Sequence, residues 1–212
     1  MKTFAFIDAS NLFYGGRKSL GWSIDYEKLL AYLKKKYEVE TIYFFGGVEI
    51  HRFPFDYLAH ETVPVRQLEE YLAGLIKEKG DYMSDAQIIL LERHLRRVRF
   101  YRKLEQFGYM LVLKPVKTYD EEGNPRRKAN CDVDMAYCLM RELNNFNRAL
   151  VLSGDGDFLP VLKFLRANEK EVLVMARGHR TAKEIKRFAG DRFMDFTRLQ
   201  HKLQRDEEEE LY

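Results

Sequence analysis

Five short apolar runs constrain the fold of this 212-residue chain more than any other feature: FAFI, IYFF, MLVL, ALVL and VLVM. None of them alternates with polar residues, which is typical of strands buried on both faces of a parallel sheet. Segments with apolar residues at helical spacing separate the runs. They cover residues 24–37, 66–79, 85–107, 131–143, 158–169 and 181–189. Alternating strands and helices predict an α/β fold with a mainly parallel central sheet.

Several element boundaries can be predicted from local signals. Asp25 is placed to cap the helix over 24–37, and Ser84 with Gln87 forms a capping-box pattern before residues 85–107. Gly108 then occupies the position of a left-handed C-cap. The remaining segments are predicted as a strand over 109–119, a turn over 120–127 and an amphipathic segment over 196–212.

Composition narrows the class of protein. The chain is 46% hydrophobic, enough for a packed core, and its net charge of +3 includes an acidic run over residues 206–210 that offsets basic clusters elsewhere. Two cysteines without metal-ligand spacing argue against a zinc site or a disulfide framework. With no membrane-spanning apolar stretch or targeting signal recognised, we expect a cytoplasmic protein that does not enter a membrane.

Acidic residues follow two of the predicted strands. Asp8 ends the first, and Asp155 and Asp157 follow the strand that ends near Leu152. In open α/β sheets ligands bind beyond the carboxyl ends of the strands, so neighbouring strands would bring these carboxylates together. Crowded carboxylates repel unless a cation or a shared proton neutralises them, and oxygen-only ligands suit Mg²⁺ or Mn²⁺.

Each acid also has a structural explanation. Asp157 is placed to cap the helix over 158–169, and Asp155 could shape a turn with its flanking glycines. Because the capping alternative applies mainly to Asp157, Asp155 is the stronger metal-ligand prediction. Asp132 and Asp134 stand at the start of a helix, where residues two positions apart face different ways, so only one of them is expected to enter the site.

The segments FAFIDASNLFY, VRFYRKLEQFGYMLVLKP, KANCDVDMAYCLM and ALVLSGDGDFLPVLKFLRANEKEVLVMA, taken together, resemble the NYN domain family. This family groups PIN-like, LabA-like ribonucleases, and the resemblance extends over residues 3–176. It implies a PIN-like three-layer α/β/α fold with a mainly parallel sheet. The corresponding domain would cover residues 1–190 with an insertion around 48–98, followed by a helical extension with an acidic tail over 191–212.

The resemblance also implies site residues. The catalytic set would be Asp8, Asn11, Asp132, Asp134, Asp155 and Asp157, with Asp8, Asp132, Asp155 and Asp157 as ligands of Mg²⁺ or Mn²⁺ and Asp134 as the rival of Asp132. Ser153 would hydrogen-bond the loop or a phosphate, and Lys128 matches a lysine that many relatives carry. One departure is Cys138, which stands where many members have a further aspartate.

Basic residues suggest where RNA would bind. The segment ERHLRRVRFYRK includes Arg96 and Arg99, a pattern suited to contacts with an RNA backbone. The alternative is a solvated helix face whose arginines pair with Glu92 and Glu105. Arg177 and Arg180 follow the last strand and are predicted to hold phosphates, while Phe13 and Tyr14 are candidates for base stacking.

The sequence therefore predicts a metal-dependent ribonuclease acting on single-stranded or structured RNA. Two alternatives remain open: a non-catalytic RNA-binding or regulatory module on the same fold, and another metal-dependent phosphoryl-transfer hydrolase. The second lacks an Asp-x-Asp nucleophile motif after the first strand, because Ser10 follows Asp8 at that spacing. A homodimer formed through residues 48–98 is compatible with each of these.

Overall fold

A computed structural model describes residues 1–13, 20–121 and 124–206. The chain divides into two compact units, one built from Met1–Phe45 and Asp132–Tyr212 and the other from Gly46–Cys131. Each unit is considered by itself below. In the described parts of the chain, no helix combines the length and the apolar character needed to cross a bilayer.

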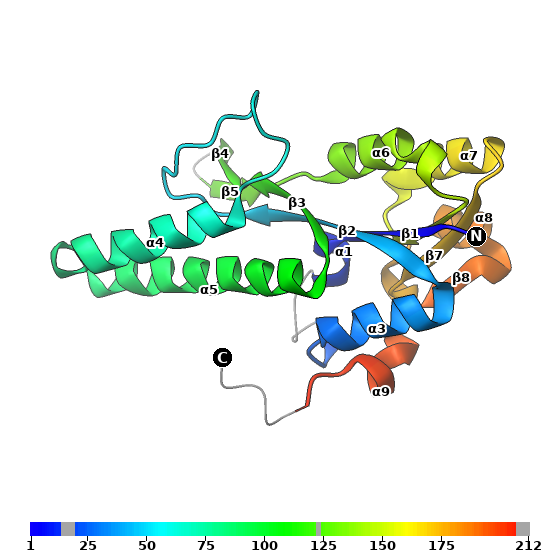
Figure 1. Cartoon of the computed structure of the whole chain (residues 1–212), viewed down its shortest axis with the longest axis horizontal. Coiled ribbons are helices and arrows are strands. Elements are labelled where there is room, and N and C mark those ends of the chain that lie inside the picture. The colour runs from blue at the N-terminus through cyan, green and yellow to red at the C-terminus, as the bar shows by residue number, and fades with distance from the viewer. Residues whose placement is uncertain (14–19, 122–123, 207–212) are drawn as a thin grey trace. The chain divides into compact units, whose positions relative to one another are not determined.

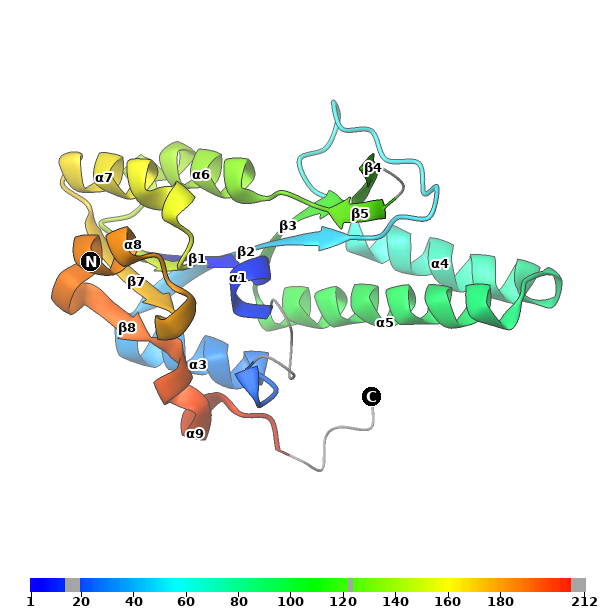
Figure 2. The same ribbon diagram turned by 180° about the vertical axis from the view of Figure 1, so that it is seen from behind.

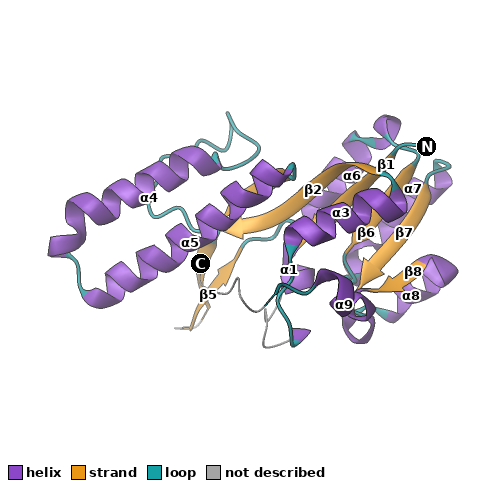
Figure 3. Ribbon diagram, turned by 60° about the horizontal axis from the view of Figure 1, so that its bottom comes forward, coloured by secondary structure: helices purple, strands orange, loops and turns teal. Residues whose placement is uncertain are grey.

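A six-stranded sheet has the order β3-β2-β1-β6-β7-β8. Its strands are β1 (Thr3–Asp8), β2 (Val39–Val48), β3 (Met110–Pro115), β6 (Arg148–Leu152), β7 (Glu171–Ala176) and β8 (Phe193–Asp195). β2 begins in the first unit, and its last residues belong to the second. The pairs from β2 through β1, β6 and β7 to β8 are all parallel (Figure 3). The predicted α/β class with a parallel sheet is confirmed.

Helices cover both faces of the sheet in the first unit, which makes three layers. α6 (Asp132–Arg141) and α7 (Leu159–Ala167) lie on one face, and α3 (Tyr26–Tyr37) lies on the other (Figures 1 and 2). The unit also contains the helices α1 (Ala9–Phe13), α8 (Lys183–Ala189) and α9 (Gln200–Leu203). The three-layer arrangement implied by the family resemblance is therefore present.

The strand β1 forms the centre of the core. All six of its residues are buried, as predicted for a strand covered on both faces. Phe6 stacks on Tyr43 of β2 with ring centroids 5.4 Å apart, and it meets Phe146 edge-on at 5.7 Å. These aromatic contacts fix β1 against its neighbours and so determine where the residue at its carboxyl end lies.

The second unit contains a long helical pair and a small hairpin. α4 (Val65–Lys79) and α5 (Asp85–Phe107) lie side by side (Figures 1 and 3), joined through a 3-10 turn, Gly80–Tyr82. The side chain of Gln87 accepts a hydrogen bond from the Ser84 N–H at 3.0 Å, and Gly108 ends α5 with φ of 101°, so both predicted helix boundaries are confirmed. β4 (Lys117–Glu121) and β5 (Asn124–Lys128) pair antiparallel.

Several segments differ from the sequence prediction. The single strand expected over 109–119 is divided at Val116, and residues expected as a turn belong to the β4–β5 hairpin. The short helix α1 directly follows β1 and was not predicted. β8 was also not predicted. In the described part of the amphipathic segment that follows it, the chain forms a 3-10 turn, Phe196–Leu199, and the short helix α9. The acidic tail beyond residue 206 lies outside the described residues.

Candidate functional site at the carboxyl ends of β1 and β6

Asp8 is the last residue of β1, and its side chain is 5% exposed. Its Oδ1 accepts hydrogen bonds from the backbone N–H of Ser10 at 2.9 Å, the Ser10 hydroxyl at 2.6 Å and the backbone N–H of Asn11 at 3.2 Å. This is the geometry of a helix cap, because the carboxylate satisfies N–H groups in the first turn of α1. This cap starts α1 directly at the carboxyl end of β1, so Asn11 lies close to the loop after β6.

Two hydrogen bonds join this turn to the loop after β6. The Ser153 hydroxyl donates to Oδ2 of Asp8 at 3.0 Å, and the Gly154 N–H donates to Oδ1 of Asn11 at 3.0 Å. The sequence left open whether these two strands are neighbours, and they are, since Ile7 of β1 pairs with Leu152 of β6. Ser153 is 2% exposed, so its bond to Asp8 is shielded from water.

Asp155 and Asp157 have different environments in the loop after β6. Asp155 is the capping residue, since its Oδ1 accepts from the Asp157 N–H at 3.0 Å, while Asp157 is exposed. The prediction that capping applies mainly to Asp157 is wrong because a 3-10 turn, Gly156–Phe158, precedes α7. Both aspartates follow β6, as expected, and whether either binds a metal stays a prediction.

Asp132 and Asp134 occupy the first turn of α6, which packs against β1 and against the turn Gly156–Phe158. Both side chains are partly buried. Among the described residues, no group of three or more His, Cys, Asp or Glu side chains is gathered closely enough to hold a metal ion. The choice between Asp132 and Asp134 therefore remains open.

Two residues that the sequence did not suggest pack against the loop after β6. A Cβ on Gly154 would lie 2.6 Å from the Thr181 hydroxyl and 3.0 Å from its Cα, and one on Gly156 would lie 2.5 Å from Oε1 of Glu184. The Ala182 N–H also donates to the Gly154 carbonyl at 2.9 Å. Gly154 therefore allows the close approach of Thr181, just before α8, and Gly156 allows the close approach of the Glu184 carboxylate in the first turn of α8. No local motif marks either contact.

At the carboxyl end of β7, the two predicted phosphate ligands have different environments. Arg180 is exposed, whereas Arg177 is only 1% exposed. Burial lowers the pKa of Arg177, and the nearby Arg180 lowers it further. Arg177 is thus an interior residue and Arg180 a surface residue, and whether either of them contacts a phosphate stays a prediction.

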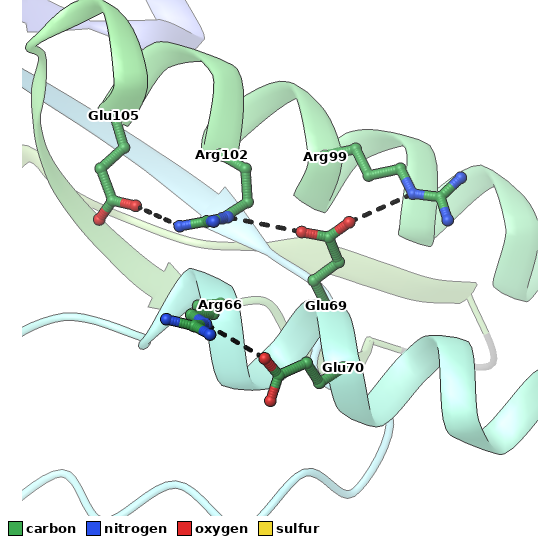
Figure 4. A network of polar contacts seen from close by, with 6 residues as sticks. All are labelled: Arg66, Glu69, Glu70, Arg99, Arg102 and Glu105. Atoms are coloured by element: carbon green, nitrogen blue, oxygen red, sulfur yellow. Dashed lines mark hydrogen bonds and ion pairs between the residues drawn. The ribbon is translucent and has the colours of Figure 1, made fainter.

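In the second unit, ion pairs involve part of the arginine cluster of α5 (Figure 4). Glu69 of α4 lies 3.3 Å from Nε of Arg99 and 3.5 Å from Nε of Arg102, and Arg102 also pairs with Glu105 at 3.0 Å. The alternative of a paired helix face is thus confirmed for Glu105, with Glu69 as a partner from the neighbouring helix. Arg96 is exposed.

The departure at Cys138 has a structural consequence in the first unit. Cys138 is 3% exposed, and burial followed by its proximity raises the pKa of Tyr43 to about 12. The Arg141 guanidinium lies 3.9 Å from Sγ of Cys138, so a charged group of the same helix borders this position. The side chains of Phe13 and Lys128, and the whole of Tyr14, lie outside what the structure describes.

The fold and the site define a class of protein: an α/β protein in which two central parallel strands, β1 and β6, end in acidic loops that hydrogen bonds join to each other. The NYN domain model matches residues 76–200, more than half of the chain, so the chain belongs to the NYN domain family. It is 23% identical to the low amplitude and bright protein LabA of Synechococcus elongatus, over 98% of this chain and 90% of that protein. It is also similar in fold to a protein of unknown function, VPA0982, from Vibrio parahaemolyticus. That likeness has a TM-score of 0.56 and 16% identity, over 92% of this chain and 91% of that one.

Proposed function

We propose that the protein is a metal-dependent ribonuclease whose site lies at the carboxyl ends of β1 and β6. The supporting observation is the pair of hydrogen bonds that couples Asp8 to Ser153 and Asn11 to Gly154. A capping role needs only Oδ1 of Asp8, yet a buried serine hydroxyl also orients Oδ2. Membership of the NYN family makes RNA the expected substrate.

The donor set fits a hard divalent cation such as Mg²⁺ or Mn²⁺. Oδ2 of Asp8 has a lone pair beyond the bond from Ser153, and the cap formed by Asp155 uses its Oδ1. Asp157 is exposed and can turn towards the site, and Asp132 or Asp134 would supply the remaining carboxylate. A bound cation would supply an activated water and stabilise charge on phosphorus.

The side chains would then have distinct tasks. Asp8 and Asp155 are the proposed cation ligands, fixed in direction by Ser153 and by the turn Gly156–Phe158. Asn11 is a positioning residue, because it holds the Gly154 backbone and through it the loop that carries Asp155. Arg180 is exposed at the end of the adjacent strand β7 and is proposed to contact a phosphate.

The test combines RNA cleavage with calorimetric titration of Mn²⁺ into the full chain. Asp8→Asn and Asp155→Asn should each reduce cleavage by about 100-fold, as for the loss of one preorganised electrostatic contact, and should weaken Mn²⁺ binding. Asp191→Asn, in an exposed turn of the same unit, is the matched control and should behave as the wild type. Equal cleavage in all four proteins would overturn the assignment.

A second candidate is a non-catalytic RNA-binding module on the same fold. It is favoured by Cys138 in the core and by the absence, among the described residues, of a ready group of three metal-ligating side chains. RNA binding without Mn²⁺ binding would select this module. The oligomeric state, including a homodimer, and a cytoplasmic location stay predictions.

A further inference from the structure

A pocket of about 300 Å³ lies within the second unit, apart from the acidic residues described above. Three segments line it: the end of β2 and the residue after it, one face of α5, and the residue between β3 and β4. The lining residues are Gly47, Glu49, Arg93, His94, Arg97 and Val116. All of them belong to Gly46–Cys131, so the pocket is complete within that unit.

The pocket divides the arginines of α5 into two groups. Arg99 and Arg102 pair with Glu69 of α4, whereas Arg93 and Arg97 line the pocket. Residues four positions apart lie on the same face of a helix, so Arg93 and Arg97 place two positive charges next to each other. Two like charges at this spacing destabilise a helix slightly, and an anion bound between them would reverse that effect.

The walls of the pocket are firmly built. The Tyr101 hydroxyl donates to the Gly47 carbonyl at 2.8 Å, and the Arg97 guanidinium lies 5.9 Å from the centre of the Tyr101 ring. A Cβ on Gly47 would lie 2.6 Å from Cβ of Ala129 and 3.1 Å from Cγ2 of Val116, so this wall is closely packed. Pre-formed walls reduce the entropy lost when a ligand binds.

His94 gives the pocket a buried polar side chain. It is 7% exposed, and its Nδ1 contacts Nε2 of His51. The His51 carbonyl in turn accepts a hydrogen bond from the Tyr71 hydroxyl at 2.9 Å, which ties the segment after β2 to α4. His94 is therefore held between its own helix and that segment, at a fixed position on the pocket wall.

We propose that this pocket binds a nucleotide 5′-phosphate, with Arg93 and Arg97 holding the phosphate group. Two guanidinium groups against the single carboxylate of Glu49 leave an excess of positive charge, which suits a phosphate monoester. A volume of about 300 Å³ exceeds what the phosphate alone needs, so a larger ligand is accommodated. Glu49 lines the same pocket, and its carboxylate would face the sugar of such a nucleotide.

A free nucleotide and the 5′-phosphorylated end of an RNA chain share this chemistry. The experiment titrates the full chain by calorimetry with adenosine 5′-monophosphate, adenosine, and a short RNA with either a 5′-phosphate or a 5′-hydroxyl. The wild type should bind the monophosphate and not adenosine. Tighter binding of the phosphorylated RNA than of the monophosphate would identify an RNA end as the ligand, and the reverse order would identify the free nucleotide.

The variant Arg93→Gln/Arg97→Gln should weaken binding of the monophosphate by about tenfold or more, because both charged hydrogen-bond donors are lost. Arg66→Gln/Lys77→Gln removes two exposed positive charges from α4 and is the matched control, expected to bind within about twofold of the wild type. Circular dichroism and thermal melting establish that both double variants are folded. Because every replaced side chain is exposed, we expect both to fold.

Three results would overturn the proposal: no binding of the monophosphate to the wild type, equal binding of adenosine, or unchanged affinity in Arg93→Gln/Arg97→Gln. Asp8→Asn separates this proposal from the ribonuclease proposal, because it should reduce cleavage by about 100-fold and leave binding of the monophosphate intact. Loss of monophosphate binding in Asp8→Asn alone would locate the ligand at the acidic site instead and would equally overturn the pocket assignment.

Discussion

The Ser153 hydroxyl donates a hydrogen bond to Oδ2 of Asp8 at 3.0 Å, although the two residues are 145 positions apart in the chain. The bond joins the ends of two neighbouring strands, β1 and β6. Asp8 is thereby held on both carboxylate oxygens, by its own helix cap on one side and by a distant loop on the other. Because different donors hold the two oxygens, the contribution of each donor to the free energy of unfolding can be measured separately.

Replacing Ser153 by alanine removes the donor to Oδ2 inside a buried environment. We expect Ser153→Ala to lower the free energy of unfolding by about 1.5–3 kcal/mol, the usual range for a hydrogen bond to a charged group. Ser10→Ala is the matched control, because Ser10 is exposed and two backbone N–H groups remain on Oδ1. Urea denaturation measures both, and a larger loss in Ser10→Ala would contradict this account.

The two glycines after β6 should respond differently to a methyl group. In Gly154→Ala the new Cβ would lie 3.0 Å from Cα of Thr181. We therefore expect overpacking to lower the free energy of unfolding by about 1–3 kcal/mol. In Gly156→Ala the close neighbour is the end of the flexible Glu184 side chain, which can move aside, so the loss should be smaller. Thermal melting compares the two variants. Equal melting temperatures would contradict this prediction, because Thr181 would then move aside as easily as the Glu184 side chain.

Glu69 pairs with two arginines of α5, Arg99 and Arg102, in the segment predicted from the sequence to contact an RNA backbone. Removing its charge in Glu69→Gln should change stability by less than about 1 kcal/mol, because the ion pairs are partly exposed. The same variant should also bind RNA more tightly at low salt, and its affinity for RNA should fall more steeply as the salt concentration rises. Glu78→Gln, an equal charge change at an exposed position of α4, is the control. Filter binding at several salt concentrations measures the effect, and identical slopes in both variants would refute it.

The hydrogen bonds to Asp195 predict that the loop after β7 is sensitive to acid. Burial acts to raise its pKa, but hydrogen bonds from Thr197 and the Gly178 N–H outweigh burial and hold the pKa below its usual value of 3.8. A lowered carboxyl pKa in the folded state gives stability that is present above the usual pKa and is lost as the pH falls through the folded-state value. Asp195→Asn should therefore be less stable at neutral pH, yet lose less stability on acidification below about pH 4. Melting temperatures measured from pH 7 to pH 3 test this, and parallel curves for the two proteins would exclude Asp195 as a source of acid sensitivity.

The sequence predicted most of the fold because its strongest signals are local. β1 and α5 follow from an uninterrupted apolar run and from a capping box with a terminal glycine, neither of which depends on distant residues. The elements that were missed are short or polar: α1 has five residues, β8 has three, and the β4–β5 hairpin is rich in charged side chains. In such segments, tertiary contacts outweigh the local pattern.

The candidate site was predicted only as a list of residues. The rule for ligand sites in parallel sheets placed these residues at the carboxyl ends of strands. Asp8, Asn11 and Ser153 lie together because β1 and β6 are adjacent, which the sequence left open. The assignment of the cap to Asp157 was wrong, since a one-turn 3-10 segment before α7 cannot be distinguished by periodicity from the helix itself. The contact of Glu184 with Gly156 depends on packing between separate elements and leaves no mark in the sequence.

The position of β1 between β2 and β6 has a consequence for how the chain acquires its structure. β2 is available soon after β1 leaves the ribosome, but β6 follows only after more than half of the protein has been made. During that interval one edge of β1, which carries the apolar run FAFI, has no partner, and such edges are prone to aggregation. The hydroxyl that orients Asp8 arrives later still, with residue 153, so nascent chains shorter than this lack the donor that orients Asp8.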